Sequence, residues 1–189
     1  HYQYDKFEEK WVNEGASVYA EVMCGYPEDR AGKFFFADPD VGLYRQSGLP
    51  SLSDYEKAYM IFQSLADTFG PEVVTEIIQQ TLHGIPGINA SIKGVGADRT
   101  FEEIFLDWAT ANLLPKGHVE GYTNYDPLAA LQTASFPEMS SQTWSSVPFF
   151  GTVYVRGPHP PMAVKVASGG LDQRFGVRSV VKEFDNTYR

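Results

Sequence analysis

The sequence predicts an α+β protein, with a mainly helical lobe followed by a small antiparallel β region. Apolar residues recur at helical spacing through the first 115 residues, where capping signals separate the segments. The composition then becomes rich in Gly, Pro, Ser, Thr and Tyr. β-branched, alternating segments follow near the end of the chain. We therefore expect a helical lobe over 1–115, a turn-rich connector over 116–148 and a β region over 149–189, the start of a β-sandwich.

The first predicted helix runs from Trp11 to Cys24. Its apolar residues fall on one face, at Val12, Ala16, Tyr19, Ala20 and Met23. Gly25 ends this helix, and Pro27 follows it. Residues 26–53 are then rich in Gly, Pro, Asp and Ser, so we expect a long surface loop there.

Two further helices follow this loop. Ser53–Glu56 has the spacing of a capping box, and apolar residues then recur at helical spacing as far as Gly70. Pro71 suits the first turn of the next helix, which we expect to reach about Leu82.

A helical pattern continues as far as Pro115, and strands are expected only after the connector. A short helical piece is expected at Ile88–Lys93, and a second capping box at Thr100–Glu103 starts an amphipathic helix that Pro115 closes. Beyond the connector, alternating apolar residues predict three strands, at 150–157, 161–169 and 175–184.

Charge and composition exclude several classes of partner. The formal net charge is -9, whereas nucleic acids and anionic membrane surfaces require clustered Lys and Arg. No run of about 18 apolar residues occurs, so we expect no membrane span. Cys24 is the single cysteine, which excludes an internal disulfide and, without an adjacent base, is a poor nucleophile. The chain opens at His1 without an initiator Met or signal peptide, so we expect a processed product or a fragment.

No complete catalytic constellation is visible in the sequence. The four histidines are far apart, and no two of them are spaced by four residues on one helix: His1, His83, His118 and His159. The motifs HExxH, GxSxG, GxGxxG and the P-loop are all missing from these 189 residues. Any catalytic assignment must therefore come from a wider pattern.

Several segments, in order, resemble the C-terminal part of secreted bacterial zinc metallopeptidases of the HExxH-plus-Glu zincin type, the hyicolysin-like group. These segments are WVNEGASVYAE, YEKAYMIFQSLADTFG, GIPGINASI, TFEEIFLDWATANLL and WSSVPFFGTVYVRG. Together they cover most of residues 1–160. In this alignment the HExxH segment would precede the chain, and His1 would lie three positions after the second zinc-binding histidine.

The resemblance implies that Glu14 is the third zinc ligand. Hydrolytic zinc sites use three protein ligands and keep one position for water, and a Glu near the start of a crossing helix suits the third. Asn13 would support Glu14 or cap the helix, and Glu21, two turns along the same face, is a second-shell carboxylate to test. The plainer alternative is that Glu14 only complements the helix dipole. Candidate oxyanion donors are Tyr122, Tyr125, His118 and His83.

The function implied is that of a fragment or processed chain of a zinc-dependent metalloendopeptidase. It would act on a peptide or protein substrate outside the cell or at its surface, and zinc would bind only with the HExxH segment present. That N-terminal part could be a separate partner chain, and without HExxH we expect this chain alone to be inactive. The alternative is an inactive peptidase-like scaffold that serves as an extracellular assembly module. A third reading makes the β region a carbohydrate- or surface-binding unit.

Overall fold

The described part of the chain is all-α. The computed structural model describes residues 6–26, 33–37, 42–43, 51–114, 119 and 150–152. Across these ranges the chain forms six helices and no strand. The α+β class predicted from the sequence is therefore wrong for the described residues, which contain no sheet. Nearly all of the connector and of the predicted β region lies outside them.

Residues 150–152 show why the strand prediction fails where it can be compared with the structure. Phe150 has a φ of 52°, in the left-handed region that a β-strand does not use. Its ring packs against two aromatic rings of the last helix, with centroid distances of 5.3 Å to Phe101 and 5.1 Å to Phe105. Contact with the helices therefore determines the conformation here, although the local alternation of residues favours a strand.

Two long helices form the centre of the structure. Helix α1 spans Lys10–Met23, close to the predicted bounds, and helix α3 spans Leu52–Phe69 and ends at Gly70. The capping box of α3 is formed by Ser51 and Asp54, so the predicted box at residues 53–56 is wrong. Asp54 Oδ2 accepts the Ser51 N–H at 2.5 Å, and this reciprocal pair starts the helix two residues earlier.

Four shorter helices complete the described fold. They are α2 (Lys33–Ala37), α4 (Glu72–Gln79), α5 (Gly84–Gly94) and α6 (Phe101–Ala111). The capping box predicted for α6 is confirmed. The Thr100 side chain accepts a hydrogen bond from the Glu103 N–H, and the Glu103 carboxylate accepts one from the Thr100 N–H. Helix α2 lies inside the predicted surface loop, α4 ends three residues early, and α5 begins four residues before its predicted start.

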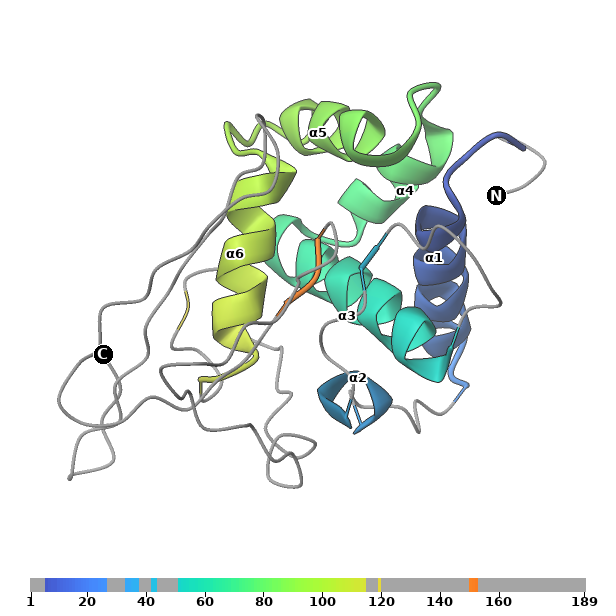
Figure 1. Cartoon of the computed structure of the whole chain (residues 1–189). Coiled ribbons are helices and arrows are strands. Elements are labelled where there is room, and N and C mark those ends of the chain that lie inside the picture. Colours follow the sequence, from blue (N-terminus) through green and yellow to red (C-terminus); the bar gives the residue numbers. More distant parts are fainter. Residues whose placement is uncertain are drawn as a thin grey trace, which may run out of the picture.

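Helix α3 is the hub of this arrangement. It contacts α1, α2, α4 and α6, and Figure 1 shows it crossing the middle of the molecule with α1 and α6 on opposite sides. Burial of apolar side chains between these helices stabilises the fold. The most buried side chains of this core include Val12, Phe35, Phe62, Leu65, Ile88, Ile92, Phe101, Ile104 and Trp108.

Two consecutive charged residues of α3 form hydrogen bonds with the backbone of segments that are distant in sequence. The Glu56 carboxylate accepts the backbone N–H groups of Phe34 at 2.7 Å and Phe35 at 2.8 Å, which fixes the start of α2. Lys57 is 1% exposed, and its Nζ donates to the carbonyl oxygen of Phe150 at 2.6 Å. Adjacent residues of a helix point about 100° apart, so one turn of α3 can hold two segments in different directions.

Within the described ranges, no helix has the length and apolar character needed to cross a membrane. This finding agrees with the prediction that the chain has no membrane span.

Candidate functional site

The start of α1 is held by two acidic residues. The Glu8 carboxylate accepts the backbone N–H groups of Glu9 at 2.6 Å and Gly84 at 2.7 Å, so it joins the N-terminus of α1 to that of α5. The Glu9 carboxylate accepts the indole N–H of Trp11 at 2.7 Å. Carboxylates are favoured at helix N-termini, where the backbone N–H groups lack partners. These contacts fix where α1 begins, and therefore where its first-turn side chains lie.

Gly84 has a backbone conformation in this junction that favours glycine. Its φ of +57° is one that side chains rarely allow, and an added Cβ would also displace the flexible Glu9 carboxylate, whose carbon would lie 2.3 Å away. Neither Glu8 nor Glu9 was predicted from the sequence to have a role. The burial of Glu8 could not be predicted from the sequence, because a charged segment such as KFEEK is typical of a solvated surface.

Asn13 faces the segment that enters the helix. Its side-chain N–H donates to the carbonyl oxygen of Glu8 at 3.2 Å, so the side chain braces the turn before α1. The N-cap residue of α1 is Glu9. The capping role considered for Asn13 is therefore wrong, and the contact that the structure gives this side chain is with Glu8.

Helices α1 and α3 approach each other closely at Gly15. A Cβ added to Gly15 would lie 2.5 Å from a ring carbon of Phe62 and 2.9 Å from the carbonyl oxygen of Ala58. Real Cβ atoms are not found at such distances, so only glycine allows this crossing. Because Gly15 directly follows Glu14, the crossing also sets how near Glu14 lies to α3.

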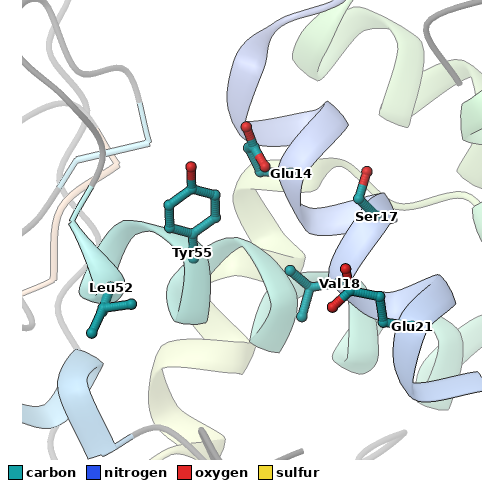
Figure 2. A pocket seen from close by; sticks show the side chains of 6 residues that line it. All are labelled: Glu14, Ser17, Val18, Glu21, Leu52 and Tyr55. Carbon is teal, nitrogen blue, oxygen red and sulfur yellow. The ribbon is translucent and has the colours of Figure 1, made fainter. Parts of the chain in front are cut away.

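A hollow of about 220 Å³ lies beside this crossing. It is lined by Glu14, Ser17, Val18 and Glu21 of α1 and by Leu52 and Tyr55 of α3. Figure 2 shows the Glu14 carboxylate and the Tyr55 hydroxyl extending toward the same side of the two helices. The structure thus brings Glu14 and Glu21 to one hollow, as their spacing of two helical turns implies.

The two carboxylates of the hollow differ in exposure but share one property. Glu14 is half-buried and Glu21 is exposed. Neither makes a hydrogen bond or an ion pair through its side chain to the described part of the chain. The contacts that hold the described helices together therefore do not use these two carboxylates.

Tyr55 is a polar residue of the hollow that the sequence did not predict as part of a site. Its place in the apolar stripe of the helix predicts a core residue, whereas the structure leaves it half-buried at the edge of the hollow. Tyr59, one turn later, is buried as the stripe predicts. The available signal was the hydroxyl, because a tyrosine usually places its polar end where a partner or water can reach it.

The other candidate residues do not join this hollow in the described structure. His83 is exposed and is the N-cap residue of α5. Cys24 is exposed at the C-terminal end of α1. Four candidates lie outside the described residues, namely His1, His118, Tyr122 and Tyr125.

The described ranges contain no group of three or more His, Cys, Asp or Glu side chains that could hold a metal ion. Glu14 offers one carboxylate ligand of a type that zinc accepts, and a catalytic zinc needs two more protein ligands. The described residues by themselves therefore do not form a zinc site.

No protein-family model, no curated protein and no solved structure matches this chain.

Proposed function

We propose that this chain belongs to a zinc-dependent metalloendopeptidase and supplies Glu14 as the third protein ligand of its zinc ion. The observation that carries the proposal is the state of Glu14. Its carboxylate lies half-buried at a hollow and makes no hydrogen bond or ion pair with the described residues. Glu14 is the fifth residue of α1, beyond the first turn in which a carboxylate complements the helix dipole, so the dipole alone does not account for it.

The packing around Glu14 supports a ligand role. Glu8, Glu9 and Asn13 hold the first turn of α1, and the close crossing at Gly15 holds the next. A metal ligand must be held in place before the metal binds, because ordering it at the moment of binding lowers the affinity. These contacts position Glu14 without using its own carboxylate oxygens.

The rest of the site would come from outside the described residues. The resemblance assigns the other two ligands to an HExxH helix encoded ahead of His1, and a bound zinc would supply a water molecule of lowered pKa for attack on a peptide bond. A peptide or protein substrate and an extracellular or cell-surface location belong to the same proposal, since they follow from that resemblance.

The test requires the polypeptide with the residues encoded ahead of His1. Zinc content after dialysis and hydrolysis of a casein substrate are measured for the wild type, for Glu14→Gln and for Glu76→Gln, a change at an exposed residue of α4. We expect about one zinc per chain in the wild type, loss of zinc and activity in Glu14→Gln, and retained zinc and activity in the control Glu76→Gln.

Two results would contradict the proposal. An upstream sequence without HExxH would leave the zinc ion without its first two ligands and would favour an inactive peptidase-like scaffold. Tight zinc binding by the 189-residue chain alone would show that the ligands lie elsewhere, because Glu14 by itself cannot hold the ion.

A further inference from the structure

We propose that Lys57 and the aromatic rings around it couple the packing of residues 150–152 to that of helix α2, so that displacing either segment loosens the other. Lys57 Nζ lies 5.7 Å from the ring centroid of Phe35 in α2. It also lies 5.2 Å from the centroid of Phe105 and 5.9 Å from that of Trp108, both in α6. A cation is attracted to the face of an aromatic ring at such distances. We call these three rings and the ammonium group the Lys57 cage.

The Lys57 cage contacts both segments through a buried charge. Lys57 is 1% exposed, and its ammonium group donates a hydrogen bond to the carbonyl oxygen of Phe150 at 2.6 Å. The preceding residue, Glu56, accepts the backbone N–H groups of Phe34 and Phe35 at the start of α2. A buried charge is costly unless its contacts are complete. Losing the contact on one side therefore weakens the position of the cation that the other side uses.

A row of packed rings also joins the two segments. The ring centroids of Phe35 and Trp108 are 5.4 Å apart, and those of Trp108 and Phe105 are 5.2 Å apart. The centroids of Phe105 and Phe150 are 5.1 Å apart, which completes the row. Phe35 is 0% exposed and Trp108 is 1% exposed, so neither ring has free space into which it can move. A ring displaced at one end of the row therefore disturbs the next.

Phe150 has a backbone conformation that depends on these contacts. In the described ranges it is the one residue other than glycine with a positive φ, at 52°. This left-handed region is unfavourable for a bulky side chain, and such a conformation persists only where surrounding contacts enforce it. The bond to Lys57 and the ring packing on Phe105 supply this enforcement. Once they weaken, the backbone relaxes to an ordinary conformation, so the release of residues 150–152 is a change between two states.

The coupling acts in both directions, because a coupling free energy between two sites is reciprocal. A partner or a substitution that displaces residues 150–152 should loosen the start of α2, and a change at the start of α2 should release residues 150–152. Neither direction involves zinc or Glu14. This inference and the zinc proposal can therefore fail separately.

The first measurement follows α2 when Phe150 is changed. Amide exchange of Phe34 and Phe35 is recorded by NMR in the 15N-labelled 189-residue chain, for the wild type, Phe150→Ala and the control Ile77→Ala. Ile77 lies in α4 and is 1% exposed, so its truncation disturbs the core away from the Lys57 cage. We expect both α2 amides to exchange about tenfold faster in Phe150→Ala, since loss of aromatic contacts changes an opening equilibrium by about that factor. In Ile77→Ala they should stay within about twofold of the wild type, while the Leu65 amide at the centre of α3 exchanges faster.

Two outcomes of this measurement would overturn the inference. Unchanged exchange of the α2 amides in Phe150→Ala would show that the two segments open independently. An equal increase in both variants would show that α2 opens only when the whole fold does. Phe150→Leu keeps most of the volume without the ring and gives the same test if Phe150→Ala does not fold, with an expected increase of about threefold.

The second measurement starts from α2. A thiol is introduced by Thr152→Cys in a Cys24→Ser background, because Thr152 is only 7% exposed and a thiol there reacts when its segment opens. Glu56→Gln weakens the hydrogen bonds to the start of α2, and we expect it to speed labelling by a disulfide reagent about fivefold. The matched control Glu76→Gln, at an exposed position of α4, should leave the labelling rate unchanged. Equal labelling rates in these two variants would contradict the reciprocal coupling.

Discussion

Replacing Gly15 with alanine tests the crossing of α1 and α3 that positions Glu14. The added Cβ would lie 2.5 Å from the Phe62 ring and 2.9 Å from the Ala58 carbonyl oxygen. Phe62 is 0% exposed, so its ring has no free space to enter, and the carbonyl oxygen belongs to the backbone of α3. The helices must therefore move apart or strain.

The size of the effect follows from two opposing contributions. Overpacking of a core costs about 1–3 kcal/mol, and backbone contact places this site near the upper end. Alanine at a helical position returns up to about 1 kcal/mol relative to glycine. We expect a net destabilisation of about 2 kcal/mol, which for a chain of this size lowers Tm by about 4–8 °C.

Urea unfolding followed by circular dichroism measures this change, with Gly94→Ala as the matched control. Gly94 is the last residue of α5, and the nearest atom to its added Cβ is a Glu76 oxygen at 3.9 Å. Alanine there should stabilise the chain by about 0.5 kcal/mol, because only helix propensity changes. If Gly15→Ala is also neutral or stabilising, the helices do not touch at Gly15, and the argument for a fixed Glu14 fails.

Two further predictions concern the charged residues around α3 and α6. Lys57→Ala should destabilise the chain by about 3 kcal/mol, because it leaves a cavity among the rings and an unsatisfied Phe150 carbonyl. Lys57→Met keeps most of the volume and should cost about half as much in urea unfolding; equal losses would show that charge, rather than packing, is the main contribution. Hydrogen bonds from the Thr100 backbone N–H and then its hydroxyl lower the pKa of the Glu103 carboxyl from its ordinary 4.5. The resulting stabilisation is present above pH 4.5 and is lost as the pH falls through the lowered value, so Glu103→Gln should flatten the decline of Tm on acidification. Parallel curves for wild type and variant would contradict this role.

Much of the helical lobe could be predicted because its signals are local. The bounds of α1 follow from the spacing of its apolar residues and from Gly25, whose φ of +85° suits the end of a helix. The capping box at Thr100 and Glu103 lies within four consecutive residues. The capping box of α3 was predicted two residues too late. Ser53 lies inside the helix, whereas Ser51 precedes the helix and forms the box with Asp54, three residues further on. Local rules therefore locate helices well and their first residues less well.

The candidate site could be predicted only in its α1 half. Glu14 and Glu21 share a face because seven residues are about two helical turns. Tyr55 and Leu52 complete the hollow from α3, and no spacing rule connects them with α1. The crossing at Gly15 decides which part of α3 meets Glu14, and that crossing depends on the shapes of both helices.

The sequence by itself determined the helical character of the lobe, its principal caps and the face of α1 that carries the glutamates. Those features depend on residues within one or two turns of each other. The tertiary structure alone decided that Glu56 holds α2, that Lys57 holds Phe150 and that a hollow opens beside Glu14. At Phe150 the structure also has a left-handed backbone where an extended one was expected, and the partly buried ring of this residue packs against Phe101 and Phe105. Contacts between residues far apart in sequence decide such cases, since their free energy depends on packing that no local pattern records.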